Sequence, residues 1–160
     1  MKQTLRNLGI SVCLGLMSTA VAADGAGDVS ATDLRARAVP EGQKNSAAFM
    51  TLSNSGSGDH AVVAAQSPVA NIVELHTHID EGGMMKMRRI DKIEVGAGSD
   101  TILQPGGLHV MLIGLKQQLN DGDDVPVTLE FEDGSRLELV VPAKKMQMKM
   151  MKEHSHGTSG

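Results

Sequence analysis

The 160-residue sequence predicts an all-β fold, an antiparallel sandwich or barrel. Its apolar residues occur in short runs separated by turn-forming residues, which is the pattern of many short strands. Eighteen glycines argue against long helices. With two Phe and neither Trp nor Tyr, the core has to be built from Val, Leu, Ile, Ala and some Met.

The expected strands are each bounded by a turn signal. The clearest hairpin is Glu132-Asp133-Gly134-Ser135, which joins the last two strands. Earlier breaks fall at residues 54–58, 82–83, 96–98 and 105–107, all of which contain glycine. In chain order the expected strands are residues 34–39, 47–52, 61–65, 71–76, 84–90, 92–95, 101–103, 108–112, 125–131 and 136–141.

Residues 1–23 have the three parts of a cleavable export signal. Lys2 and Arg6 supply the positive start, an apolar stretch follows, and small residues allow cleavage after Ala22 or Ala23. The apolar stretch is shorter than the roughly 20 residues of a membrane span. A lipid anchor at Cys13 fits poorly, because Val12 stands where a small residue is expected. We therefore expect an exported, periplasmic protein that is not inserted in the membrane.

The expected domain organisation places one folded domain between two flexible ends. About 138 residues remain after cleavage, which is enough for one domain with a core. The expected boundaries are a signal peptide at 1–23, a flexible leader at 24–32, a sandwich domain at 33–142, and a flexible Met/His-rich tail at 143–160.

Cleavage would remove Cys13, the only cysteine in the chain. A mature chain without thiols excludes disulfides, iron–sulfur clusters, cysteine-ligated zinc and blue-copper electron transfer. Without Lys2 and Arg6, 13 basic residues remain against 19 acidic ones, a balance of −6. This charge disfavours nucleic acid and anionic lipid as partners and suits a protein that handles cations.

Two imidazoles and two thioethers form a candidate metal site: His76, Met87, His109 and Met111. Ten residues separate His76 from Met87, twenty-one separate Met87 from His109, and one separates His109 from Met111. Because side chains alternate along a strand, His109 and Met111 should share one face, opposite Val110 and its neighbours. Thioether sulfur is a soft ligand that suits Cu(I). Taken singly, each His is typical of a solvated residue and each Met of a core gap-filler, so the set of four carries the prediction.

This spacing resembles the ligand signature of the PCuAC family of periplasmic copper chaperones. The resemblance covers most of residues 33–142, and residues 45–54 are similar to the family's early strand, with Phe49 where an aromatic residue is often found. The other matching segments are residues 73–78, 83–88, 105–112 and 122–127.

The resemblance implies a cupredoxin-like β-sandwich that binds Cu(I) through His76, Met87, His109 and Met111. In that family the copper passes toward the copper centres of respiratory oxidases. The implied partners are therefore an oxidase copper-site domain or another copper chaperone. The chemistry of the residues agrees, because four neutral ligands with two thioethers favour Cu(I) over harder divalent ions. Met87, just after Gly82-Gly83, is expected to reach the site from a loop.

Three alternatives stay open at this stage. The protein could buffer periplasmic copper without a dedicated recipient, or it could be a metal-free structural sandwich. A copper enzyme is disfavoured, since the sequence shows no nucleophile–base arrangement or redox cofactor motif and lacks tyrosine. We expect a non-catalytic protein.

Further Met and His residues surround this signature. His78 would share a face with His76, but only His76 fits the family spacing. Met84 and Met85 are candidate reserve ligands, although packing beneath a loop is the stronger expectation. The tail holds four Met and two His between Met146 and His156, where a disordered solubilising tail is the plain alternative. The candidate auxiliary copper ligands there are His154, His156, Met148 and Met151, and the harder imidazoles favour Cu(II).

Overall fold

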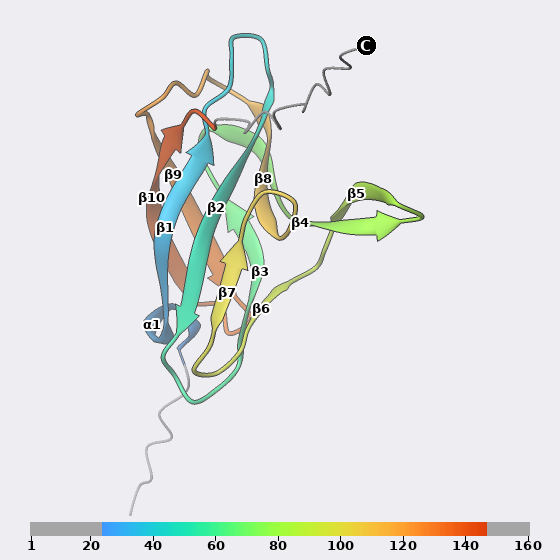
Figure 1. Ribbon diagram of the computed structural model, residues 1–160. Helices are drawn as coiled ribbons and strands as arrows, with labels where there is room; N and C mark the ends of the chain where they lie inside the picture. The colour runs from blue at the N-terminus through green and yellow to red at the C-terminus, as the bar shows by residue number, and fades with distance from the viewer. Residues whose placement is uncertain (1–23, 147–160) are drawn as a thin grey trace, which may run out of the picture.

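The computed structural model describes residues 24–146 of the chain (Figure 1). Almost all of its regular structure is β-strand, as the sequence predicts. Each expected strand overlaps one of the strands observed in this part of the chain. The elements are α1 (Gly25–Asp28), β1 (Val29–Arg37), β2 (Asn45–Asn54), β3 (His60–Gln66), β4 (Ala70–Glu81), β5 (Met84–Arg89), β6 (Ile93–Val95), β7 (Asp100–Leu103), β8 (His109–Leu115), β9 (Asp124–Phe131) and β10 (Arg136–Lys144).

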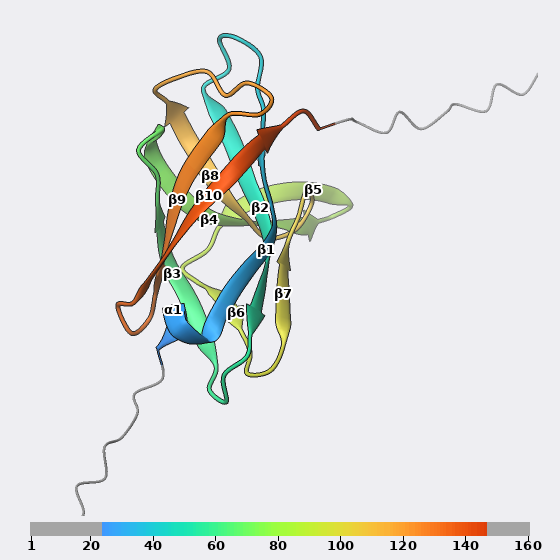
Figure 2. The same cartoon turned by 90° about the vertical axis from the view of Figure 1, so that its left-hand side faces the viewer.

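The strands form two layers, which Figures 1 and 2 show from two sides. The first layer has the order β5-β4-β8-β2-β1, with β7 also paired to β2. The second has the order β10-β9-β3-β6. Neighbours within each layer are antiparallel, and one short parallel pairing joins β1 to β10 at Ala36↔Ala143 and Arg37↔Lys144. The fold is therefore a β-sandwich whose two layers are continuous along one edge.

The core between the layers is mostly aliphatic, as the composition requires. Val110 and Leu112 of β8 and Leu129 of β9 have no exposed surface, and Phe131 is 1% exposed. Phe49 is also buried, but its side chain lies outside the core between the two layers. Ala48 and Met50, its neighbours on β2, join the core cluster, so Phe49 points to the outer face of the first layer. That face therefore has a buried aromatic side chain of its own.

Residues 24–32, expected to be a flexible leader, instead form α1 and the first residues of β1. Side chains of the β9–β10 turn hold this segment. The Gly25 amide donates to Asp133 Oδ2 at 2.7 Å, and the Ala26 amide donates to Ser135 Oγ at 2.9 Å. The expected domain start at residue 33 was therefore wrong. At the other end, β10 runs to Lys144, past the expected boundary at residue 142.

Strands β4 and β5 form a long hairpin that leaves the body of the sandwich (Figure 1). Strand β4 pairs with β8 only from Ala70 to His76, and beyond that point its partner is β5 alone. Gly82 and Gly83 close the hairpin with φ angles of 66° and 83°. Positive φ at both positions is the requirement of a tight hairpin turn, which glycine meets without strain. We call residues 77–89 the arm.

The described residues hold no helix that is long and apolar enough to span a membrane.

Candidate metal centre

The pairing of β4 with β8 brings two imidazoles together. His76 lies opposite His109, and Glu74 lies opposite Met111. Directly opposed residues of an antiparallel pair share one face of the sheet. The His76 and His109 ring centroids are 5.7 Å apart. Strand alternation thus places His109 and Met111 together, as predicted, and the pairing adds His76 beside them.

Met87 reaches the same face from β5. It lies opposite His78, two residues along β4 from His76. The four residues of the predicted site therefore share one face of the first layer. Met87 sits in a regular strand, not in a loop folded over the rim, so that expectation was wrong. The physical reason is the Gly82-Gly83 turn, which lets residues 84–89 pair back along β4.

His109 is buried and has one ring nitrogen without a partner. Only 2% of the residue is exposed, so it is not a solvated side chain. Its Nδ1 lies 3.0 Å from the Gly107 carbonyl, which accepts hydrogen bonds only, so Nδ1 carries the proton. The lone pair is therefore on Nε2, which is buried and makes no hydrogen bond. Phe49 packs beside the ring, with centroids 6.2 Å apart.

The surroundings of His109 also keep its imidazole neutral. Burial lowers its pKa, and nearby His78, His76 and Arg37 lower it further, while the hydrogen bond to Gly107 acts in the opposite direction. A neutral imidazole is the form that binds metal ions. The lowered pKa of His109 thus keeps Nε2 unprotonated and able to bind a metal ion.

His76 has the complementary arrangement. Its Nε2 lies 2.8 Å from Glu74 Oε2, so Nε2 carries the proton and donates it to the carboxylate. The lone pair lies on Nδ1, which is buried and has no hydrogen-bond partner. Metal-binding imidazoles commonly donate their other ring N–H to a carboxylate in this way, which fixes the orientation of the ring. Glu74 is itself 3.6 Å from Arg89.

These two nitrogens stand apart from the other polar side chains of residues 24–146. His76 Nδ1 and His109 Nε2 are the buried side-chain nitrogen or oxygen atoms in that part of the chain that lack a hydrogen-bond partner. A buried polar atom without a partner is costly and calls for an explanation. Two of them on neighbouring, facing residues are explained by a ligand that accepts two nitrogen lone pairs.

A hollow of about 380 Å³ opens beside these residues. Its lining includes Met87, His109, Met111 and His78. Met87 is 43% exposed, whereas Met111 is partly buried beside Ala47 of β2. Two sulfurs at different depths therefore face the same hollow as the His109 ring.

The donor set fits a soft metal ion better than a hard one. Within residues 24–146, no group of three His, Cys, Asp or Glu side chains is arranged to hold a metal. A centre on this face therefore needs the thioethers as ligands. Two imidazole nitrogens and two thioether sulfurs suit monovalent copper.

Three neighbours of the predicted site differ from expectation. His78 is closer to His109 than His76 is, with ring centroids 5.3 Å apart. Met84 and Met85 were expected to pack beneath a loop, yet they are 62% and 59% exposed on the arm. No core lies beneath them, because the arm extends from the sandwich. The candidate tail ligands His154, His156, Met148 and Met151 lie outside the described residues.

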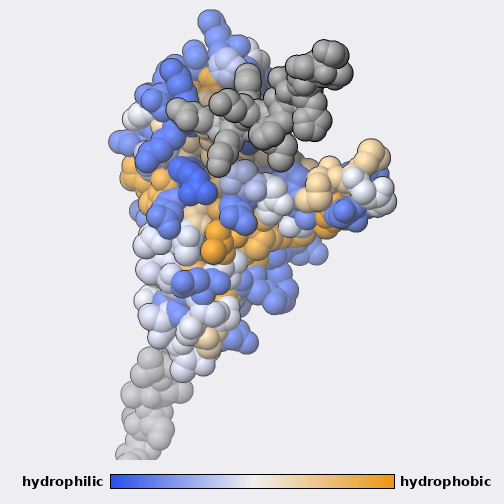
Figure 3. Space-filling model, viewed as in Figure 1, coloured by the Kyte–Doolittle hydropathy of each residue, from blue (hydrophilic) through white to orange (hydrophobic). Residues whose placement is uncertain are grey.

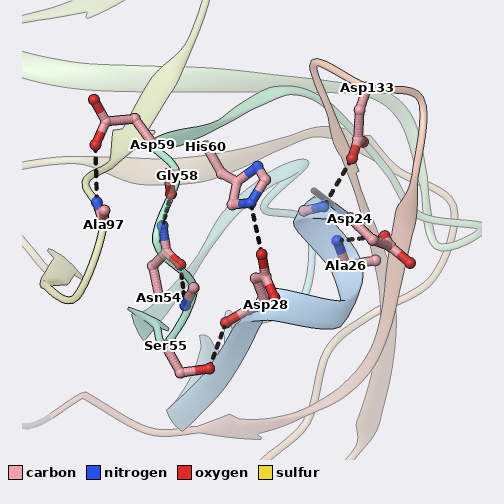
Figure 4. Close-up of polar contacts among 12 residues, drawn as sticks. Asp24, Ala26, Asp28, Asn54, Ser55, Gly58, Asp59, His60, Ala97 and Asp133 are labelled. Atoms are coloured by element: carbon pink, nitrogen blue, oxygen red, sulfur yellow. Dashed lines mark hydrogen bonds and ion pairs between the residues drawn. The ribbon is translucent and has the colours of Figure 1, made fainter. Parts of the chain in front are cut away.

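A second histidine cluster, at the α1 end of the molecule, was not predicted. His60 is 4% exposed, and its Nδ1 lies 2.9 Å from Glu132. Its Nε2 lies 3.3 Å from Asp28, the contact drawn in Figure 4. The hydrogen bond to Glu132 raises the His60 pKa, and Asp28 raises it further against the effect of burial. Both ring nitrogens have partners, so this cluster has a structural role. Its only signal in the sequence is one His among acidic residues, too weak to interpret.

The comparisons with known proteins agree with the fold. A family model described as "Putative lipoprotein LpqE-like" matches residues 29–143. A protein of Leifsonia xyli subsp. xyli described as a putative lipoprotein is 40% identical over 104 residues, which are 64% of this chain and 63% of that protein. The chain thus spans less than two thirds of that relative.

Solved structures of PCuAC domains share the architecture. The Cu(I) form of DR1885 from Deinococcus radiodurans is 36% identical with a TM-score of 0.59, covering 76% of this chain and 83% of that one. The copper-bound PCuAC domain of PmoF2 has a TM-score of 0.64 at 21% identity, over 76% of this chain and 96% of that one. The second likeness shows the fold alone. The chain belongs to the LpqE-like family, which is a family of the PCuAC type.

Proposed function

We propose that this chain is an exported copper chaperone that binds one Cu(I) through His76, Met87, His109 and Met111. The observation that carries the proposal is the pair of buried, unpartnered nitrogens on the same face as two thioethers. The Cu(I) form of DR1885, which is 36% identical to this chain and shares its fold, supports the proposal. Copper is the cargo of such a protein.

The residues divide the work between holding the ion and releasing it. His76, oriented by Glu74, and His109, oriented by Gly107, are fixed before the ion arrives. Met87, at 43% exposure, is the ligand that a recipient can displace first. Exchange of one thioether for another leaves copper monovalent and moves no proton. One open side and one rigid side support delivery by ligand exchange.

We further propose that the recipient is the copper-site domain of a respiratory oxidase or another copper chaperone. The support is the family resemblance, because the geometry of the site concerns only the ion and carries no information about the recipient. Copper buffering is the second candidate, and the Met/His-rich tail favours it by offering extra ligands. We infer no catalytic role.

Copper-ligand counting tests the binding proposal directly. X-ray absorption of the Cu(I) form should show two nitrogen and two sulfur neighbours, and a nitrogen-only shell would refute the site. Mixing the Cu(I)-loaded chain with an apo oxidase copper domain then separates the two functions. Directional transfer supports delivery, whereas several coppers kept per chain without transfer support buffering.

Export is part of the proposal and has its own test. The family and the Leifsonia relative are described as putative lipoproteins, which supports a place in the cell envelope. For this chain we propose cleavage after Ala22 or Ala23 and a periplasmic location. Mass spectrometry of the mature protein distinguishes that N-terminus from a lipid-bearing Cys13.

A further inference from the structure

The hollow at the site is lined by a histidine that the four-ligand set leaves out. His78 lines it together with Met87, His109 and Met111, whereas His76 is not part of the lining. His76 instead lies behind, with its Nε2 on Glu74 and its Nδ1 buried. An ion that enters from solvent therefore meets the His78 side of the site before the His76 side.

His78 is placed to bind a metal ion and is held only loosely. Its Nδ1 lies 3.5 Å from the Gly107 carbonyl, a long contact that favours a proton on Nδ1 and a lone pair on Nε2. It lies directly opposite Met87 in the β4–β5 pairing, so the two side chains share a face. Its ring is 5.3 Å from that of His109, within reach of the deeper site.

Met85 extends this row of ligands toward the tip of the arm. Side chains alternate along β5, so Met85 lies on the face of Met87 and Met84 lies on the opposite face. Met84 and Met85 are almost equally exposed, at 62% and 59%. Figure 3 shows apolar side chains on the projecting arm. A thioether in water at this position is open to a soft ion.

The cations of the arm are paired with carboxylates, and two of the three lie on the face away from this row. Lys86 and Arg88 belong to the face of Met84, where both pair with Glu81. Arg89 is on the ligand face but contacts Glu74. On the arm, therefore, no unpaired Lys or Arg repels a monovalent cation beside Met85 and Met87.

We propose that His78, Met85 and Met87 form an exchange position for Cu(I) on the arm, through which the ion enters and leaves the deeper site. The inference rests on the proposed function and adds a route to it. In the outward direction, His78 Nε2 binds copper as His76 Nδ1 leaves. The Met85 sulfur then binds as His109 Nε2 leaves. Each step exchanges one neutral ligand for another, so copper stays monovalent and no proton is transferred.

Exchange kinetics test this route with a matched control on the same strand. The probe is the Cu(I) chelator bicinchoninate, added in excess to the Cu(I)-loaded full chain. We expect Met85→Leu and His78→Ala to slow copper release about tenfold, because the loss of an exchange ligand raises the barrier between the arm and the deeper site. The same barrier slows entry equally, so the equilibrium affinity stays close to wild type. Met84→Leu, on the other face with similar exposure, should release copper at the wild-type rate.

The outcomes separate this inference from the proposed function. If wild type fails to bind Cu(I), the proposed function fails first. If wild type binds Cu(I) but Met85→Leu releases it at the wild-type rate, or Met84→Leu slows release equally, the exchange position is refuted. A second measurement uses Ag(I) as a redox-inert probe of a His109→Ala, Met111→Ala double variant. Ag(I) should still shift the methyl resonances of Met85 and Met87 and leave that of Met84 in place, whereas no shift at Met85 would overturn the proposal.

Discussion

His76 on β4 lies directly opposite His109 on β8, with ring centroids 5.7 Å apart and the two rings oriented by different partners. Glu74 fixes one ring and the Gly107 carbonyl fixes the other. As a consequence, the nitrogen with an unpartnered lone pair is Nδ1 in His76 and Nε2 in His109. Because each imidazole has an assigned proton and an assigned lone pair, single substitutions can test the role of each ring.

Replacing His109 should remove most of the Cu(I) affinity. His109→Ala deletes a proposed ligand whose unpartnered nitrogen is buried. We therefore expect the Cu(I) affinity to fall more than about a hundredfold, beyond the loss typical of changes to residues that only hydrogen-bond a ligand. A competition titration against a Cu(I) chelator measures it. Because the side chain also packs on Phe49, urea unfolding should accompany the titration, and His109→Gln, of more similar volume, serves as the second variant. Unaltered affinity in a folded variant would contradict the site.

Glu74→Gln tests the orientation of His76 without touching a proposed ligand. Glutamine keeps a side-chain oxygen that can accept from His76 Nε2 but loses the negative charge of the carboxylate. We expect a loss of about 10- to 100-fold in Cu(I) affinity, the range for partners of metal-binding histidines. Glu138→Gln, an exposed carboxylate on β10, is the matched control. If both variants bind like wild type, Glu74 only forms its ion pair with Arg89.

The strands and the sharing of a face by His109 and Met111 could be predicted because both depend on local periodicity. Alternation along residues 108–112 is a property of one strand and needs no knowledge of its neighbours. The turn at residues 132–135 is equally local, and β9 and β10 are joined there as predicted. The fold class follows from many such signals together.

What the sequence could not supply depends on pairing between distant segments. The register that sets His76 opposite His109 pairs β4 with β8 across three intervening strands, and no local pattern fixes it. Likewise α1 is held by a hydrogen bond between residues 108 positions apart, Gly25 and Asp133. No pattern within residues 24–32 announces that contact. The shielding of His109 by Phe49 is a third case, since the two belong to different strands.

Removal of residues 147–160 should separate the tail from the deeper site. The tail carries His154, His156, Met148 and Met151 as candidate ligands. We expect the truncated chain to bind one copper fewer under oxidising conditions and to keep its Cu(I) affinity, because the deeper site lies within residues 76–111. Metal analysis after dialysis against Cu(II) measures the first quantity, and chelator competition measures the second. Equal Cu(II) stoichiometry in both chains would leave the tail as a solubilising segment only.

The His60 cluster predicts a dependence of stability on pH that is independent of copper. Because Glu132 and Asp28 raise the His60 pKa in the folded state, the protonated ring stabilises the fold. This contribution is fully present below the unfolded value of 6.5 and is lost as the pH rises through the folded pKa. Wild type should therefore exceed His60→Gln in free energy of unfolding by more at about pH 5.5 than at about pH 9, a range that brackets histidine titration. Urea denaturation of the metal-free chains at both pH values gives the comparison. The groups that face His60 are the carboxylates of Glu132 and Asp28, so a Glu132→Gln variant should lose much of the same dependence. A difference between wild type and His60→Gln that stays constant or grows with pH would show that His60 is neutral in the folded protein.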